Sequence, residues 1–473
     1  MMEQFWNSDD REIHEECGVF GVYGVENAAS ITYYGLHSLQ HRGQEGAGIV
    51  SVNADKVLKR VKGEGLVSEV FDNAKLSTLE GNKAIGHVRY ATTGGGGIEN
   101  VQPFLFKHHT GDFALAHNGN LVNSKELKRY LEDRGSLFQS TSDSEILAHL
   151  MRKESNQVRR IQGIVDALNM LEGAFAFLIL SGNRLYCARD KYGLRPLSIG
   201  MLNGGYVVSS ETCAFEVIGA KFLRDVEPGE VVVIDDDGIH SYDYSRYKHR
   251  NMCAMEYIYF SRPDSDIEGR NVHAFRKESG KHLYKECPTE ADIVVGVPDS
   301  ANSAAIGYAE ASGIPYEMGL IKNKYVGRTF IQPSQELRER GVRMKLSAVT
   351  SIVKDKRVVL IDDSLVRGTT CRRIVALLKS VGAKEVHVRI ASPQITNPCF
   401  YGVDLSTYEE LISARHSVEE VRQIIGADSL YFLSKEALLE SAKREQLCLA
   451  CFTGNYPTAL YSSIRDANKD GKN

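Results

Sequence analysis

The sequence predicts two domains of different class, an α+β sandwich followed by an α/β domain with a parallel sheet. In the first half, short β-like runs are separated by Gly or Asn turns with few helical patterns, which favours a layered α+β arrangement. In the second half, strand and helix patterns alternate, which favours a doubly wound parallel sheet. The polar stretch 241–251 separates the two patterns, so we place the domain boundary near residue 245.

Hydrophobic spacing predicts the individual elements. The β-like runs of the first half are Gly18–Tyr23, Gly46–Val52, Ala84–Val88, Phe113–Ala116, Ala174–Leu180 and Val231–Ile234. Helical patterns are found there at Ser124–Glu132 and Ser144–Arg152. Beyond the boundary, the strand Ile293–Val297 precedes a helix over Ala301–Ser312.

The most informative stretch is VVLIDDSLVRGTT, residues 358–370. An apolar run ends in the adjacent carboxylates Asp362 and Asp363, and a short loop follows. Apolar residues then recur at helical spacing over 374–381, and alternation over 386–390 predicts another strand. The loop therefore lies at the carboxyl end of a parallel strand, where α/β sheets bind ligands.

This loop combines groups that suit a phosphorylated sugar. Amides of a Gly/Thr loop entering a helix favour a phosphate, and neighbouring carboxylates suit a ribose diol or an oxygen-ligated Mg²⁺. An ordinary turn with an acidic pair is the alternative, but the whole ordered string is more specific than a bare Gly-rich turn. The string resembles the signature of the type I phosphoribosyltransferases. The resemblance implies that phosphoribosyl pyrophosphate is bound by Asp362, Asp363, Ser364, Arg367, Gly368, Thr369 and Thr370.

The composition argues against a nucleic acid or an anionic membrane as a partner. The 473 residues include 57 basic and 61 acidic side chains, so the formal net charge of −4 gives no footprint for nucleic acid or an anionic membrane. The mean hydropathy is −0.26, and no apolar run has the length of a membrane span. Residues 1–16 lack the features of a signal peptide, so we expect a cytoplasmic protein. Its nine cysteines are then expected to be thiols, catalysts or metal ligands.

Cys17 opens the string CGVFGVYG, and a buried strand cysteine is the commoner meaning of such a residue. Later strings change that interpretation: LQHRGQEGAG from Leu39, GHVRYATTG from Gly86, HNGNLVN from His117 and STSDSE from Ser140. In this order they resemble the glutaminase domain of the N-terminal-nucleophile amidotransferases, an αββα sandwich. The resemblance implies a propeptide, residues 1–16, that is cleaved before Cys17, and a glutaminase domain over 17–245.

A cysteine at a chain start carries both a thiol and an amine, of unperturbed pKa about 7.7–8.0, that can accept the thiol proton. The thiolate attacks the carboxamide of glutamine, and the negative tetrahedral oxygen then needs fixed donors. By resemblance these donors are the Asn118 side chain and the Gly119 amide. The resemblance also assigns glutamine binding to Arg89, Thr92 and Asp143, with Arg89 on the α-carboxylate and Asp143 on the α-ammonium. Taken alone, Arg89 and Asp143 would be interpreted as a surface ion pair.

A second strand–loop–helix unit is GVPDSANS, residues 296–303. By resemblance, Asp299 and Ser300 of this loop bind the pyrophosphate group. One Mg²⁺ per subunit would be held by Ser300 together with Asp362 and Asp363.

The segment 322–345 holds seven Lys or Arg residues and two Glu, with no sustained apolar stripe. A charged run is usually a solvated surface. Because this one lies between two phosphate-binding candidates, we interpret it as a mobile cationic lid over the polyphosphate.

Both halves together resemble the glutamine phosphoribosyl pyrophosphate amidotransferases, from Cys17 to the C-terminus. The resemblance implies an enzyme that makes 5-phosphoribosylamine, glutamate and pyrophosphate from phosphoribosyl pyrophosphate, glutamine and water, the first step of de novo purine biosynthesis. It also implies feedback inhibition by purine nucleotides and a homotetramer. The phosphoribosyltransferase domain would cover 246–440, and a tail, 441–473, would follow.

Other functions stay open at this level. The glutaminase strings also suit a glucosamine-6-phosphate synthase, but its isomerase half has no use for the Asp362 loop. A regulator that senses phosphoribosyl pyrophosphate would use the loop for binding alone and would need a basic DNA-binding surface. An amidotransferase that aminates another phosphoribosyl-linked acceptor would differ only in its product.

Four cysteines suit a metal centre. Cys448 and Cys451 form CLAC after the helical pattern 435–445, without the strand that precedes a thioredoxin-type pair. Cys253 and Cys399 lie at positions that supply the other ligands in iron–sulfur members of the resembled family. Four thiolates suit zinc and [4Fe–4S] about equally. The resemblance favours one [4Fe–4S] cluster per subunit, with a structural role in holding the tail.

Overall fold

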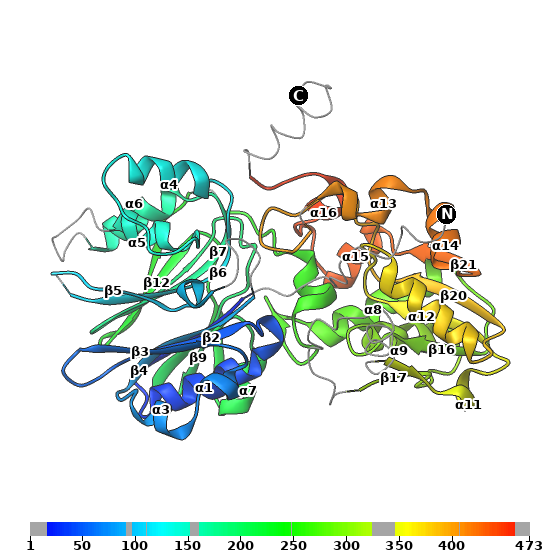
Figure 1. Ribbon diagram of the computed structural model, residues 1–473, viewed down its shortest axis with the longest axis horizontal. Helices are drawn as coiled ribbons and strands as arrows, with labels where there is room; N and C mark the ends of the chain where they lie inside the picture. The colour runs from blue at the N-terminus through cyan, green and yellow to red at the C-terminus, as the bar shows by residue number, and fades with distance from the viewer. Residues whose placement is uncertain are drawn as a thin grey trace.

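The computed structural model describes residues 17–90, 97–109, 111–151, 160–246, 248–323, 346–405 and 407–458. Two lobes lie side by side (Figure 1). The first contains two large antiparallel sheets with helices outside them, and the second contains a parallel sheet. The predicted fold class is therefore confirmed.

The first lobe is built on two stacked sheets. The seven-stranded sheet has the order β11 (Lys221–Asp225), β9 (Ser198–Leu202), β10 (Gly205–Ser209), β1 (Gly18–Tyr23), β4 (Lys83–Arg89), β2 (Gly46–Val52) and β3 (Leu58–Glu64). The six-stranded sheet has the order β13 (Gly238–Asp243), β12 (Glu230–Asp235), β8 (Leu185–Arg189), β7 (Gly173–Ser181), β6 (Phe113–Leu121) and β5 (Phe104–Phe106). Because β1 is covered on both faces, its sequence is apolar throughout rather than alternating.

Helices cover the outer face of each sheet and complete four layers. The seven-stranded sheet carries α1 (Ala28–Ser38), α2 (Val67–Val70), α3 (Asn73–Ser77) and α7 (Cys213–Ile218), and the six-stranded sheet carries α4 (Ser124–Glu132), α5 (Glu145–Met151) and α6 (Arg160–Met170). A third apolar core fills the space between the sheets. This is the αββα sandwich expected from the resemblance.

The second lobe has a four-stranded parallel sheet with the order β16 (Ile293–Gly296), β19 (Arg357–Asp362), β20 (Glu385–Ile390) and β21 (Ser429–Phe432). One face packs against α8 (Val272–Glu286), α9 (Asn302–Ser312) and α15 (Lys435–Ala442), and the other against α12 (Thr369–Ser380) and α14 (Val418–Ile425). A small antiparallel pair, β17 (Leu320–Lys322) and β18 (Leu346–Ala348), lies beside them. Burial on both faces explains the unbroken apolar run before Asp362.

The helices α8 and α9 approach each other through two glycines. A Cβ on Gly280 would lie 1.8 Å from the Ala304 carbonyl oxygen, and one on Gly307 would lie 1.8 Å from the Lys277 carbonyl oxygen. Only glycine allows the two backbones to come so close. This contact sets the position of α9, whose N-terminus follows the Asp299–Ser300 loop.

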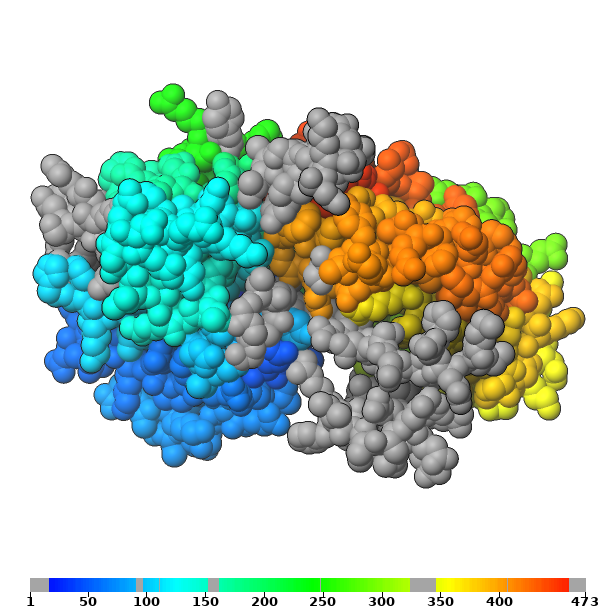
Figure 2. All heavy atoms as spheres, turned by 45° about the horizontal axis from the view of Figure 1, so that its top comes forward, coloured from blue at the N-terminus to red at the C-terminus, as the bar shows by residue number. Residues whose placement is uncertain are grey.

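The C-terminal segment returns toward the first lobe. Cys448 forms an isolated parallel bridge with Cys253, and α16 (Ala450–Thr453) follows. Phe400 lies beside the first lobe, because its carbonyl oxygen accepts a hydrogen bond of 2.9 Å from the Asn120 amide. In Figure 2 the cyan surface of the first lobe meets the orange surface of the second along this boundary. Among the described residues, no helix is long and apolar enough to cross a membrane.

Candidate active sites

The proposed nucleophile lies at the beginning of the central strand of the first lobe. Cys17 directly precedes β1, which pairs with β10 on one side and β4 on the other. Its thiol is partly exposed, and its Sγ is 3.5 Å from the carbonyl oxygen of Tyr90, just beyond the end of β4. The predicted propeptide, residues 1–16, lies outside the described residues.

The predicted oxyanion donors are on β6 in the other sheet. The Asn118 side chain is fully buried, and neither of its amide atoms has a hydrogen-bond partner among the described residues. A buried amide without partners is costly, so such a group is suited to meet a polar ligand atom. Gly119 has φ +139°, and a Cβ there would lie 2.1 Å from the Ala174 carbonyl oxygen. Glycine is therefore required next to Asn118.

The predicted glutamine-binding residues are largely buried, which argues against an ordinary surface ion pair. Arg89, the last residue of β4, is 6% exposed and donates to the Gly97 carbonyl oxygen at 3.2 Å. The Asp143 carboxylate is 16% exposed and accepts a hydrogen bond of 2.7 Å from the Leu121 amide, at the end of β6. Thr92, the third predicted residue, lies outside the described residues.

Two buried histidines that were not predicted as site residues connect these elements. The His87 ring, on β4, lies with Nε2 3.1 Å from the His117 carbonyl oxygen, on β6. The His117 ring contacts the Ser144 hydroxyl at 2.8 Å and lies 3.7 Å from Asp143. Burial lowers the pKa of His87 to about 3, so this ring is neutral at physiological pH. The pair joins the strands that carry Arg89 and Asn118.

In the second lobe the two predicted loops meet at the carboxyl edge of the parallel sheet. Strands β16 and β19 are neighbours, with Gly296 opposite Ile361. The Ser300 hydroxyl donates to the Asp363 carboxylate across this edge, and the Ser364 hydroxyl donates to it at 2.6 Å. The Asp363 amide in turn donates to the Asp362 carboxylate at 3.0 Å. The structure thus brings together the three residues that we predicted as magnesium ligands.

Burial raises the pKa of Asp363 above its usual value, although Ser300, Ser364 and the Arg276 guanidinium oppose the shift. Arg276 comes from α8 and was not predicted. It is almost fully buried and lines a small hollow together with Ser300 and Asp363. Sequence offered no signal for Arg276, because nothing local distinguishes it from other helical arginines.

The predicted phosphate loop enters a helix as expected. Gly368 has φ +75° and caps α12, and Thr369 and Thr370 form the first turn of that helix. The Arg367 guanidinium pairs with the Glu410 carboxylate at 2.9 Å.

Asp299 lies outside the hydrogen-bonded group formed by Ser300, Asp362 and Asp363. Its carboxylate is 63% exposed and lies 3.6 Å from the Lys322 ammonium. Lys322 begins the predicted cationic lid, whose residues 324–345 lie outside the described residues.

The four predicted cluster cysteines come from three segments that converge. The backbone of Cys448 forms a β-bridge with that of Cys253. The amides of Thr396 and Asn397 donate to the Cys451 carbonyl oxygen, and Cys399 lies in the same region. Burial raises the pKa of the Cys448 thiol to about 12, and the neighbouring Cys399 contributes to the shift. Within the described ranges, no three His, Cys, Asp or Glu side chains are grouped closely enough to hold a single metal ion.

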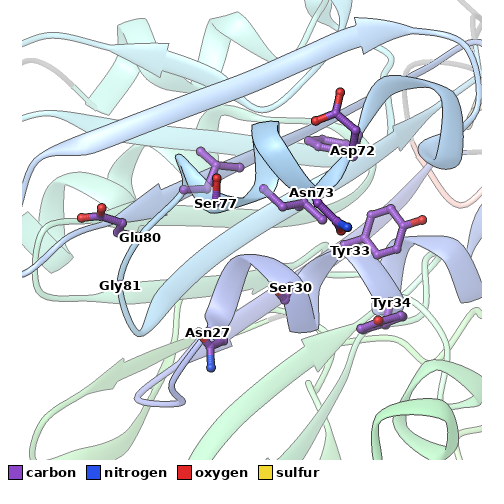
Figure 3. Close-up of a pocket in the computed structure, with 12 residues that line it drawn as sticks. Asn27, Ser30, Tyr33, Tyr34, Asp72, Asn73, Ser77, Glu80 and Gly81 are labelled. Carbon is purple, nitrogen blue, oxygen red and sulfur yellow. The ribbon is translucent and has the colours of Figure 1, made fainter.

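A larger hollow than the one beside Asp363 lies away from both sites. It has a volume of about 490 Å³ and lies between α1 and α3, with Tyr33, Asp72 and Asn73 on its walls (Figure 3). None of the predicted site residues lines it.

Comparison with known proteins identifies the domains that carry the two sites. A glutamine amidotransferase domain model matches residues 89–217, and a phosphoribosyl transferase domain model matches residues 274–393. The amidophosphoribosyltransferase of Bacillus subtilis (strain 168) is 61% identical over 456 residues, which is 95% of each chain. That of Staphylococcus epidermidis (strain ATCC 12228 / FDA PCI 1200) is 52% identical over 465 residues, covering 97% of this chain and 94% of the relative.

Solved structures give the same result. The B. subtilis glutamine phosphoribosylpyrophosphate amidotransferase complexed with ADP and GMP has a TM-score of 0.90 and 60% identity, covering 94% of this chain and 98% of that chain. The predicted function, an enzyme with glutaminase and phosphoribosyltransferase domains that acts at the start of purine biosynthesis, is confirmed by these relatives. The chain therefore belongs to the amidophosphoribosyltransferase family.

Proposed function

We propose that this enzyme makes 5-phosphoribosylamine, glutamate and pyrophosphate from phosphoribosyl pyrophosphate, glutamine and water. One observation carries the proposal: a single chain joins two sites of complementary chemistry. In the first, a partly exposed cysteine precedes a central strand, and a buried amide without described partners lies in the same lobe. In the second, a strand ends at a buried carboxylate pair followed by a glycine-capped helix.

In the glutaminase half, Cys17 would be the first residue of the mature chain, after removal of residues 1–16. Its α-amine accepts the thiol proton, and the thiolate attacks the glutamine carboxamide. Asn118 and the Gly119 amide stabilise the tetrahedral oxygen, ammonia leaves, and water hydrolyses the γ-glutamyl thioester. Arg89 forms a bidentate pair with the substrate α-carboxylate, while Thr92 and Asp143 bind the rest of the amino-acid portion.

In the transferase half, ammonia attacks C1 of the ribose with inversion and displaces pyrophosphate. Asp362 and Asp363 bind the ribose hydroxyls. The residues that bind the phosphate groups are Asp299, Ser300, Ser364, Arg367, Gly368, Thr369 and Thr370.

One Mg²⁺ per subunit fits this edge, since Ser300, Asp362 and Asp363 offer the oxygen ligands that it prefers. The raised pKa of Asp363 supports the fit, because a cation would compensate for the burial of its charge. Bound Mg²⁺ would neutralise charge on the pyrophosphate leaving group.

Replacement of the nucleophile tests the assignment. Cys17→Ala should abolish glutamine-dependent synthesis and leave ammonia-dependent synthesis measurable, because the transferase half contains none of the glutaminase chemistry. Cys287→Ala, in a partly exposed thiol at the end of α8, is the matched control and should keep both activities. Loss of both activities in folded Cys17→Ala, or a fully active chain that still begins at Met1, would refute the proposal.

We further propose that Cys253, Cys399, Cys448 and Cys451 bind one [4Fe–4S] cluster per subunit. Their convergence from three segments and the soft thiol donors support this. The cluster would be structural, since a metal centre that joins distant segments contributes its binding energy to folding.

We also propose how the enzyme is regulated and assembled. A B. subtilis relative has been solved with ADP and GMP, which supports purine nucleotides as feedback inhibitors of this cytoplasmic enzyme. We propose a homotetramer. Inhibition of initial rates by GMP and ADP tests the first point, and light scattering of the purified protein tests the second.

A further inference from the structure

A fully buried ionic cluster lies where the two lobes meet. Arg42, Arg195 and Glu211 come from the first lobe and Glu256 from the second, and none of these four side chains is exposed. The charges of the two arginines and two glutamates balance, and the partly exposed His41 ring also contacts Glu211 at 2.7 Å. Burying charges in this way is costly unless each is well paired, so the cluster specifies a particular arrangement of the lobes.

The cluster has Arg42 at its centre. The Arg42 Nε donates to Glu211 at 2.5 Å, and its Nη2 pairs with Glu256 and with the Ser261 hydroxyl, the latter at 3.2 Å. Arg195 reaches the same Glu256 carboxylate at 3.3 Å. Burial would raise the pKa of Glu256, but Arg42 and Arg195 outweigh it and hold this pKa below its usual value. Glu256 is therefore charged and binds Arg42 firmly.

Arg42 belongs to the turn that supports the glutamine site. This turn is the short helix η1 (Gln40–Arg42) with Gly43 after it. A Cβ on Gly18, the residue after the nucleophile, would lie 3.4 Å from the Arg42 Cδ. A Cβ on Gly43 would lie 2.6 Å from the Arg89 carbonyl carbon. The turn thus packs against the backbone beside Cys17 and against Arg89.

Glu256 is itself held from the second lobe. It begins the helical turn Glu256–Phe260. The Arg276 guanidinium donates hydrogen bonds to three carbonyl oxygens in and directly after this turn: Tyr257 at 2.8 Å, Tyr259 at 3.0 Å and Ser261 at 2.8 Å. The carboxylate therefore projects from a fixed backbone rather than from a loose loop.

We infer that Glu256 is a positioning residue for the glutamine site, supplied by the transferase lobe. It acts through Arg42, which keeps the turn at residues 40–43 against Gly18 and Arg89. The glutaminase half is then incomplete without the other lobe, even though the nucleophile, the oxyanion donors and the substrate-binding side chains all lie within one domain. This inference rests on the proposed glutaminase role of Cys17 and Arg89.

The first test is Glu256→Gln, which keeps the side-chain shape and removes its charge. We expect the KM for glutamine to rise by about ten- to a hundredfold, because a small misplacement of a binding group has effects of that size. Ammonia-dependent synthesis should fall far less. The matched control is Glu268→Gln: Glu268 is also a buried carboxylate of the second lobe that pairs with a buried arginine of the first, Arg189 at 2.7 Å, but it does not contact the turn. Glu268→Gln should lower stability without raising the KM for glutamine.

A second variant separates positioning from stability. Arg42→Met alone leaves two buried carboxylates short of a partner, whereas Arg42→Met with Glu256→Gln restores the charge balance. The double variant should unfold at a higher temperature than Arg42→Met alone, and its KM for glutamine should remain as high as in Glu256→Gln alone. Additive effects of the two changes on this KM would overturn the inference, as would equal effects of Glu256→Gln and Glu268→Gln. A wild-type enzyme that fails to use glutamine would instead refute the proposed function.

Discussion

Buried carboxylates in this enzyme differ in the direction of their pKa shifts, as Glu211 and Asp363 show. Burial would raise the pKa of Glu211, but the charges of His41 and Arg42 outweigh it and hold the pKa well below its usual value. Asp363 is also buried, yet its pKa is raised, because the hydroxyls of Ser300 and Ser364 and the charge of Arg276 do not offset the desolvation. A bound cation would therefore offset the buried charge of Asp363, as is expected of a ligand-binding carboxylate.

Neutralising Asp363 should impair phosphoribosyl transfer with either nitrogen source. Asp363→Asn removes a charged contact worth about 1.5–3 kcal/mol, so kcat/KM for phosphoribosyl pyrophosphate should fall roughly ten- to a hundredfold. Basal glutaminase activity should persist. Asp292→Asn is the control, because Asp292 pairs with Arg357 at the opposite end of β19. Unchanged kinetics in Asp363→Asn would contradict the assignment.

The neutral His87 ring should make the fold sensitive to mild acid. The folded state keeps His87 unprotonated to about pH 3, whereas the unfolded chain binds a proton below about pH 6.5. The free energy of unfolding should therefore decrease as the pH falls from 6.5, by roughly 2 kcal/mol at pH 5 from this group.

Urea unfolding of wild type and His87→Gln at pH 7 and pH 5 measures this loss. The glutamine amide can still donate to the His117 carbonyl oxygen but does not titrate, so the variant should lose less stability on acidification. His240→Gln, in an exposed ring, should behave as wild type. Identical pH dependence in wild type and His87→Gln would show that His87 does not control this transition.

At the scale of elements, periodicity predicted most bounds well, and its errors have tertiary causes. The strands Gly18–Tyr23 and Gly46–Val52 and the helix Ser124–Glu132 were predicted with their observed bounds. The strand predicted over Phe113–Ala116 continues to Leu121, because the polar HNGN run pairs with β7 as far as Gly173. Such pairing with a distant strand overrides a local pattern that resembles a turn.

The close contact between α8 and α9 should not tolerate a larger side chain at its glycines. Gly307→Ala should destabilise the protein by about 1–3 kcal/mol, because its Cβ would overlap the Lys277 backbone and force the helices apart. Scanning calorimetry measures the shift in Tm. Glu310→Ala, exposed on the same helix, should change stability by no more than about 0.5 kcal/mol. An equal Tm in wild type and Gly307→Ala would mean that the helices can separate without cost.

In the whole molecule, the contacts between the two lobes could not be predicted from the sequence. The site strings were found because their residues are adjacent in the chain, as in the Asp362 loop. Arg276 and Glu256 lie outside such strings. Arg42 belongs to the string from Leu39, but nothing in that string indicates its pairing with Glu256, which is far away in the sequence. Periodicity reports which face of an element is buried, but it does not report which element lies opposite.

The proposed [4Fe–4S] cluster also joins segments that are far apart in the sequence. Cys399→Ser should give a colourless protein with little iron and a protease-sensitive C-terminal segment, because the three segments lose the metal centre that joins them. Iron analysis, absorption spectra and limited proteolysis of anaerobically purified protein measure this. Cys213→Ser should keep the colour. A colourless wild type with stoichiometric zinc would overturn the cluster and retain the four ligands.

The arginines at the boundary also bear on how the chain is made. Arg195 donates to Glu256 and to the Tyr401 carbonyl oxygen, and both acceptors emerge from the ribosome long after Arg195 itself. Domains usually fold from the N-terminus as synthesis proceeds, but here the first lobe has to keep this guanidinium hydrated until residue 401 has been made. The two lobes therefore dock late in synthesis. A chain truncated before residue 401 would expose the surface around Arg195 to chaperones and proteases.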